Sequence, residues 1–444
     1  MKTILNLMVL FTTVQFVTCS GNDNNQYTEL NKKMNQIAEQ YVKLVLKTGQ
    51  FDSDYVDAFY GPSEYKPVAA IKDSSAELST LNSSVDKLLD ELEKLGNYKA
   101  DEIETLRYKF LSKQILSLKS KLFLIGGGTL SFDEESKALY DAIAPTHDEN
   151  YFQNLITELD KELPGKEDIL TRFNEFRKKF IIPKEKLDTV FNAAINKCRK
   201  ITSGHIKLPA DENFQVEYVT DKPWGGYNWY KGNNYSLIQV NTNLPVYIDR
   251  AIDLAAHEGY PGHHVYNTLL EQNLYRKRSW VEFSVYPLFS PQSLIAEGSA
   301  NYGIQVVLPG EKRIKFEKEV LFPLAGLDSS KTEEYYSVLK LISKLDYAGN
   351  EAARNYLDGK FTKKQTVNWL MKYSLMPRER AEQRLKFIEK YRTYVINYNL
   401  GQDIIKNYII SHGGIDDNPQ LRWGLFTKII STPQTPSGLI VKQN

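Results

Sequence analysis

The sequence has few cysteines, almost no net charge, and no long apolar run beyond its N-terminus. Two cysteines in 444 residues cannot form the disulfide framework of a small secreted domain. The 56 basic and 55 acidic side chains leave a formal charge of +1, which argues against a nucleic-acid-binding surface. After residue 20, no stretch reaches the ~18 apolar residues of a transmembrane helix. A hydrophobic fraction of 42% suffices for a large core, so the chain is not a disordered one.

The N-terminus has the pattern of an export signal. The apolar stretch 4–17 is too short to cross a bilayer but has the length of a signal-peptide core. Cys19 and a polar run follow it, as in a bacterial lipoprotein signal, where the cysteine is lipidated after cleavage. We therefore predict a signal peptide over 1–19, a polar linker over 20–26, and a bacterial protein exported to the periplasm or outer-membrane surface and held there by a lipid anchor. A plain signal peptide cut nearby is the alternative.

Apolar side chains recur with helical spacing along most of the remaining chain. They predict helices over 27–48, 75–96, 101–124, 133–143, 149–162, 166–180 and 184–200, and again from about 290 to 411. The segment 57–62 has the composition of a turn, and 235–242 has the pattern of a strand. We therefore predict a mainly α fold with a small β-sheet in its second half. An N-terminal helical region, 27–200, would pack as one unit with a mostly helical region, 201–444, that carries the site.

Three of the six histidines lie within eight residues, at His257, His263 and His264. A His-Glu pair on a helix, followed later in the sequence by a further histidine, is the basic pattern of the metal-binding helix of zinc peptidases. Neutral imidazoles bind Zn²⁺, and Glu258 could accept a proton from a water that the ion activates. The usual spacing is His-Glu-x-x-His, but Pro261 occupies the second histidine position. On an unbroken helix, His264 would lie about 10 Å along the axis from His257, too far to share one ion.

A break at Pro261 and Gly262 would remove this difficulty. Proline cannot donate an N–H and displaces the preceding turn, and with the glycine it can form a bulge that absorbs two residues. If these two residues are left out, His-Glu-x-x-His is restored with His263 as the second ligand. His264 remains the alternative ligand.

The third ligand should be acidic and lie on a later helix. Glu297 in the segment Ala-Glu-Gly-Ser-Ala-Asn-Tyr is the candidate. Asn301 lies one turn beyond it and could hydrogen-bond a ligand histidine.

These residues resemble a known family. The motif 257–264, followed by Glu297-Gly298, resembles the bacterial family called domain of unknown function 885, which is grouped with the zincin-like metallopeptidases. The segments 55–62, 223–230 and 239–242 are similar to flanking segments of the same family. The resemblance implies a zincin-like helical peptidase fold and zinc-dependent hydrolysis, and it leaves the substrate undefined.

Two further positions bear on the family pattern. Many members have tryptophan where this chain has Ser299, a difference that affects the shape of the pocket rather than the ligand. The segment 397–401 resembles the Ser-Tyr-x-x-Gly stretch of the family. Its Tyr398, together with His264, is a candidate donor to the oxyanion of the reaction.

The sequence thus predicts an exported metallopeptidase with one Zn²⁺ bound by His257, His263 and Glu297, and with Glu258 as general base. Its partner would be a peptide or small amide. The strand 235–242 could align an extended peptide by main-chain pairing, or it could be an ordinary sheet strand that touches no substrate. One alternative is a metal-dependent hydrolase of a non-peptide amide or ester. Another is a non-catalytic, metal-stabilised binding protein of the cell surface.

Overall fold

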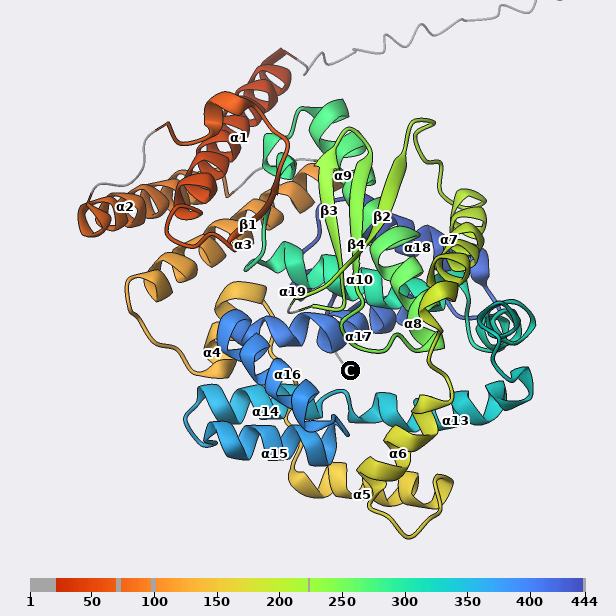
Figure 1. Ribbon diagram of the computed structural model, residues 1–444. Helices are drawn as coiled ribbons and strands as arrows, with labels where there is room; N and C mark the ends of the chain where they lie inside the picture. Colours follow the sequence, from red (N-terminus) through yellow and green to blue (C-terminus); the bar gives the residue numbers. More distant parts are fainter. Residues whose placement is uncertain (1–20, 69–72, 97–100, 223, 442–444) are drawn as a thin grey trace, which may run out of the picture.

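The computed structural model describes residues 21–68, 73–96, 101–222 and 224–441 (Figure 1). Helices dominate and two small sheets complete the fold, which confirms the predicted fold class. The predicted signal peptide and Cys19 lie outside the described residues. No helix within the described ranges is both long and apolar enough to cross a bilayer.

The first half of the described chain forms the helices α1 (Gly21–Thr48), α2 (Ser74–Glu93), α3 (Glu102–Ile125), α4 (Phe132–Tyr140), α5 (Glu149–Glu162), α6 (Ile169–Lys178) and α7 (Leu187–Ser203). Asp101, Ser131 and Asp148 cap three of them by accepting hydrogen bonds from first-turn backbone N–H groups. These helices confirm the periodicity argument. The segment predicted as a linker is helical from Gly21 onward, because α1 begins there.

The strands form two sheets. β1 (Val56–Phe59) pairs antiparallel with β5 (Val285–Pro287). β2 (Asn213–Val219), β3 (Gly226–Gly232) and β4 (Tyr235–Asn241) form a sheet in the order β2-β4-β3, in which β4 pairs parallel with β2 and antiparallel with β3. The predicted strand is therefore confirmed as β4. The predicted turn over 57–62 is wrong up to Phe59, because β5, a partner distant in sequence, draws that segment into a sheet.

The second half is again helical. Its α-helices are α8 (Ile248–Leu254), α9 (His263–Leu270), α10 (Pro291–Val307), α11 (Glu311–Phe316), α12 (Phe322–Ala325), α13 (Thr332–Ile342), α14 (Ala348–Leu357), α15 (Lys363–Tyr373), α16 (Arg378–Tyr391), α17 (Ile396–Ser411), α18 (Pro419–Ser431) and α19 (Pro436–Leu439). In the described part of the chain, three π-helical segments continue helices, namely η3 (Ala255–Gly259), η4 (Glu271–Arg276) and η6 (Glu317–Leu321). Short 3₁₀ segments are η1 (Ser63–Tyr65), η2 (Lys184–Lys186), η5 (Val281–Ser284), η7 (Ser329–Lys331), η8 (Ser343–Leu345) and η9 (Arg392–Val395).

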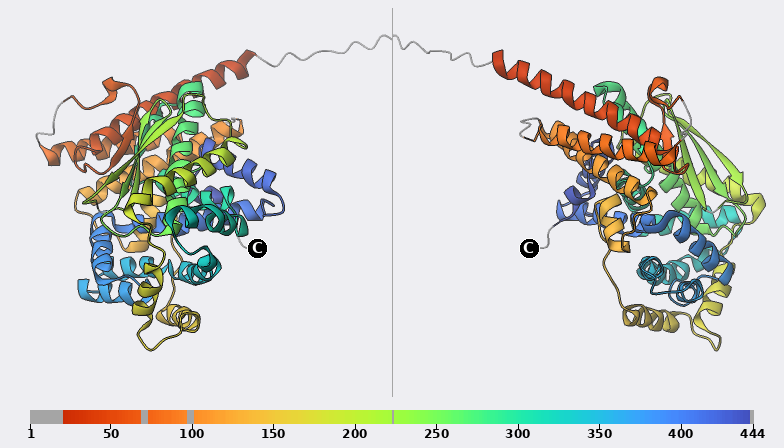
Figure 2. Two further views of the ribbon diagram at one scale, coloured as in Figure 1. Left: turned by 45° about the vertical axis from the view of Figure 1, so that its right-hand side comes forward. Right: turned by 90° about the vertical axis from the view of Figure 1, so that its left-hand side faces the viewer.

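The elements pack around one large core. Its buried side chains come from helices of both halves, including Tyr41, Phe110, Ile252, Leu294 and Phe426. Cys198 is a free thiol and part of this core. Figures 1 and 2 show α1, α2 and α3 at one end of the molecule and α5, α14 and α15 at the other, with α10 and α17 between them. β3 packs against η3 and α9, and β4 packs against α9.

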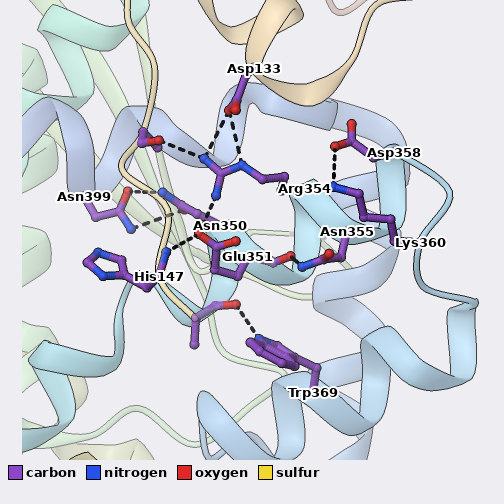
Figure 3. Close-up of polar contacts among 12 residues, drawn as sticks. Asp133, His147, Asn350, Glu351, Arg354, Asn355, Asp358, Lys360, Trp369 and Asn399 are labelled. Carbon is purple, nitrogen blue, oxygen red and sulfur yellow. Dashed lines mark hydrogen bonds and ion pairs between the residues drawn. The ribbon is translucent and has the colours of Figure 1, made fainter. Parts of the chain in front are cut away.

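A buried polar cluster fastens α4 and the following segment to α14 (Figure 3). The Arg354 guanidinium donates to Asp133 Oδ1 at 3.1 Å and to the Ala144 carbonyl at 2.8 Å, and it pairs with Glu351. Glu351 also accepts a hydrogen bond of 3.0 Å from the His147 backbone N–H. Because Arg354 is buried, these partners are what make its charge tolerable there.

Candidate metal centre

The three clustered histidines lie on a helix that is interrupted once. α8 continues into η3, which contains His257, and the chain leaves helical geometry at Tyr260 before α9 begins at His263. A Cβ atom on Gly262 would lie 1.9 Å from the His257 carbonyl oxygen, so a glycine is needed for the two segments to approach this closely. The predicted break at Pro261-Gly262 is thus confirmed, and it brings His263 beside His257.

Donor atoms of three predicted ligands meet at this break. The Nε2 atoms of His257 and His263 lie 3.1 Å apart, and Glu297 Oε2 lies 3.4 Å from the first and 3.7 Å from the second. Glu297 reaches this point from α10. In a tetrahedral zinc site with bonds of about 2.1 Å, donor atoms are about 3.4 Å apart. The observed separations therefore fit a single ion of this size.

The hydrogen bonds of Glu297 also fit a bound cation. Its Oε1 accepts a hydrogen bond of 2.7 Å from the Tyr394 hydroxyl. Its Oε2 is buried and has no hydrogen-bond partner within the described chain. Leaving a buried carboxylate oxygen unsatisfied is costly, so Oε2 has the properties of an atom that binds something else.

The electrostatics of the cluster favour positive charge. Burial by itself would lower the pKa of His263, but the carboxylates of Glu297, Glu258 and Asp57 raise it to about 9. Burial would likewise raise the pKa of Glu297, yet the two histidines hold it well below its usual range. Three carboxylates around two imidazoles thus create a site that attracts a cation.

Asn301 orients the first histidine. Its Oδ1 lies 2.9 Å from His257 Nδ1, and its Nδ2 donates to the Tyr398 carbonyl at 2.9 Å. Because the amide oxygen can only accept, Nδ1 carries the proton, and the lone pair of Nε2 points toward His263 and Glu297. The predicted contact from Asn301 to a ligand histidine is confirmed, and this contact selects the tautomer that binds a metal.

Glu258 is held close to the three donor atoms. It is buried, and its carboxylate Oε1 lies 4.0 Å from His257 Nε2. Its backbone carbonyl accepts a hydrogen bond of 2.7 Å from Asn228 Nδ2 on β3. A Cβ atom on Gly226 would lie 3.1 Å from Oε1, so the glycine leaves space for this carboxylate. The sheet therefore positions the predicted general base.

Two tyrosines, Tyr394 and Tyr398, lie one helical turn apart beside Glu297. Tyr398 lines the cavity beside the site, and its ring centroid lies 5.7 Å from that of Tyr394. Burial and the nearby Glu297 raise the pKa of Tyr398 well above its usual value, so its phenol stays protonated and can donate. Tyr394 was not predicted from the sequence as a site residue, although its position four residues before Tyr398 places both side chains on one helix face.

His264 does not face the site. Its Nδ1 lies 2.9 Å from Ser236 Oγ on β4, its Nε2 lies 2.9 Å from Glu212 Oε2, and the side chain is fully buried. Both ring nitrogens are occupied, so the predictions of His264 as oxyanion donor or alternative ligand are wrong. The physical reason is its position on α9, where one residue beyond His263 the side chain points about 100° away, toward the sheet.

The peptide-aligning role predicted for the strand 235–242 is also wrong. β4 is the central strand of its sheet, with β2 on one side and β3 on the other. Its backbone N–H and C=O groups are therefore already paired along both edges and are not free to pair with a substrate.

A cavity of about 780 Å³ opens beside the donor atoms. All three segments that flank the motif in the family resemblance contribute to its lining, through residues such as Asp57, Tyr227 and Asn241. The Tyr227 hydroxyl donates a hydrogen bond to Asp57. Burial raises the pKa of Asp57 to about 6. Asp57 was not predicted from the sequence as a site residue, because nothing in its local segment indicates that it lies beside residues distant in sequence.

Comparisons with known proteins give a likeness of fold. No family model matches the chain and no curated protein matches it, so the family resemblance rests on the motif residues alone. A solved structure described as a "putative lipoprotein" from Colwellia psychrerythraea is similar with a TM-score of 0.52 and 14% identity, over 82% of this chain and 68% of that one. Another, described as a "putative lipoprotein of unknown function" from Shewanella oneidensis, has a TM-score of 0.45 and 12% identity, over 82% and 72%. The Colwellia protein shares the fold of this chain.

Proposed function

We propose that this chain is a zinc-dependent metallopeptidase of the zincin-like kind that its motif resembles. The observation that carries the proposal is the meeting of His257 Nε2, His263 Nε2 and Glu297 Oε2 at separations of 3.1–3.7 Å. Two imidazoles and one carboxylate form the ligand set of catalytic zinc sites that keep a fourth position open. A zinc ion bound there would supply a Lewis acid and a water with a pKa of about 7.

Glu258 is the proposed general base. Its buried carboxylate accepts a proton from the attacking water and later delivers it to the leaving amine. Asn228 bonds the backbone of this residue, and Gly226 leaves space for its carboxylate. This placement supports a hydrolase over a purely structural metal site, because holding a metal requires no base. The protonated Tyr398 phenol is the proposed donor to the substrate oxygen that becomes negatively charged.

We also propose that the protein is a bacterial lipoprotein, anchored through Cys19 after export. The apolar stretch before this cysteine and the polar run after it support the proposal. The description of the Colwellia structure as a lipoprotein points the same way.

The test uses the chain from residue 20 onward. Its metal content is analysed, and the protein is then incubated with a peptide library to detect cleavage. We expect one zinc per chain and cleavage that a chelator abolishes and added zinc restores. Glu258→Gln should keep zinc and lose cleavage, whereas His257→Ala should lose both. His412→Ala is the control, since that histidine is exposed and contacts only its own helix terminus. Absence of zinc from the purified protein, or full cleavage by Glu258→Gln, would overturn the proposal.

A further inference from the structure

Five arginines line the cavity beside the metal centre. They come from α6, α8, α11 and α16 and are Arg177, Arg250, Arg313, Arg380 and Arg384. Arginine is always charged and is costly to gather in one place without partners. The pairing of each guanidinium therefore shows which charges are compensated within the protein.

Two of these arginines have carboxylate partners. Arg313 pairs with Asp253 at 2.9 Å and with Glu317 at 2.8 Å, so its charge is compensated by the fold. Arg250 lies 3.7 Å from Asp253 as well and is about half exposed. These two arginines need no external anion.

Among the described residues, the other three have weaker compensation or none. Arg384 Nε is buried and has no hydrogen-bond partner within the described chain, and its guanidinium packs over the Phe387 ring at 4.8 Å. Arg177 Nε is also buried and has no hydrogen-bond partner within the described chain. The carboxylate nearest to its guanidinium is that of Asp249, at 3.9 Å. Arg380 forms no ion pair with any described residue. Three guanidinium groups thus face one cavity with unused donors.

Nearby positive charges increase the need of these arginines for a negatively charged partner. Arg380 lies one helical turn from Arg384 on α16, and it feels the positive charges of Arg177 and Arg250. Burial together with these like charges lowers the pKa of Arg380. Asp346 is the acidic residue that faces Arg384, but the two do not reach ion-pair distance. An anion from outside the protein would complete this cluster.

A chain of ring contacts connects this cluster to the metal centre. The Phe387 ring below Arg384 lies 6.4 Å from the Tyr398 ring, which lies 5.7 Å from the Tyr394 ring. The Tyr394 hydroxyl donates to Glu297. Arg384 therefore lies beyond Tyr398, and Arg177 and Arg380 line the same cavity. A substrate bound across the metal centre could extend into this part of the cavity.

We propose that Arg177, Arg380 and Arg384 bind a carboxylate of the substrate, so that the peptidase selects peptides with negative charge close to the cleaved bond. This inference rests on the proposed function. Guanidinium groups bind carboxylates through paired N–H donors, and such charge-assisted bonds are the strong ones. The carboxylate could be a free C-terminus or the side chain of Asp or Glu, and the chemistry of recognition is the same.

The test compares four versions of one peptide, with a C-terminal acid or amide and with Glu or Gln beside the cleaved bond. Binding to the zinc-loaded Glu258→Gln chain is measured by fluorescence anisotropy, and kcat/KM is measured with the unsubstituted chain. We expect the preferred acidic form to bind about 10- to 100-fold more tightly than its neutral partner. Preference for the C-terminal acid identifies a terminal carboxylate, and preference for Glu identifies a side chain. Equal binding of all four peptides would overturn the inference.

Substitutions at the arginines localise the effect. Arg384→Gln should remove most of the preference for the acidic peptide over its neutral partner. Arg380→Gln is the second variant, since Arg380 is more exposed and its loss perturbs folding less. Arg378→Gln on the same helix is the matched control, because Arg378 is exposed, faces Glu382 and does not line the cavity. Equal effects of Arg384→Gln and Arg378→Gln would also overturn the inference.

These readouts separate the inference from the proposed function. If no peptide is cleaved but acidic peptides still bind in an Arg384-dependent way, the hydrolase proposal fails and the anion site stands. If peptides are cleaved without regard to charge, the hydrolase stands and the anion site fails.

Discussion

Gly298 and Gly401 bring the backbones of α10 and α17 into direct contact. A Cβ atom on Gly298 would lie 2.3 Å from the carbonyl carbon of Gly401, and a Cβ atom on Gly401 would lie 2.9 Å from Gly298 Cα. No larger side chain fits at either position without separating the helices. Glu297 precedes the first glycine and Tyr398 lies three residues before the second, so this contact sets the distance between the ligand helix and the tyrosines.

Gly298→Ala should therefore destabilise the protein and disturb the metal centre together. The added methyl group meets backbone rather than a movable side chain, so we expect a loss of about 1–3 kcal/mol in the free energy of unfolding. Urea unfolding of the metal-free chain measures it. Gly424→Ala in α18 is the control, because a Cβ atom there meets nothing within 4 Å and alanine favours a helix by about 1 kcal/mol. Equal stability of the two variants would contradict this account of the helix contact.

Gly226→Ala should reduce turnover without removing zinc. Its Cβ atom would lie 3.1 Å from Glu258 Oε1 and 2.6 Å from Leu254 Cδ2, so the proposed base must shift while the three proposed zinc ligands keep their positions. We expect kcat to fall at least about 10-fold, because general-base catalysis depends on position. Elemental analysis checks the zinc. Gly225→Ala is the control, since its Cβ atom meets nothing within 4 Å. A large loss of zinc in Gly226→Ala would show that the substitution acts on the ligands instead.

Arg354→Met should cost far more stability than the loss of an exposed ion pair. Arg354 is buried, and its removal leaves Glu351 in the core without its cationic partner (Figure 3). Breaking a buried pair of this kind costs about 3–5 kcal/mol. Lys360→Met, which removes the exposed contact of Lys360 with Asp358, should change stability by at most about 1 kcal/mol. Thermal unfolding of both variants makes the comparison, and a similar melting temperature for the two would contradict the structural role of the cluster.

The local sequence was sufficient to predict what depends on neighbours along the chain. Helices follow from periodicity and caps, and the Pro261-Gly262 break follows from the need to bring His263 to His257. Contacts between distant segments were not predictable in this way. Asp57 reaches the cavity because β1 pairs with β5, and the ring of His264 contacts Ser236 on β4 and Glu212, which lie in other segments of the chain. Such placements depend on packing that no local pattern encodes.

Asn301 should control metal affinity without touching the metal. Its Oδ1 accepts the Nδ1 proton of His257, and replacement by alanine frees the ring to rotate and to change tautomer. We expect Asn301→Ala to weaken zinc binding by about 10- to 100-fold, as measured by competition with a chromophoric chelator. Asn301→Asp keeps an acceptor for Nδ1 but loses the hydrogen bond to the Tyr398 carbonyl, so it should retain most of the affinity. Equal weakening by both substitutions would show that the contact with Tyr398, rather than the orientation of His257, is what matters.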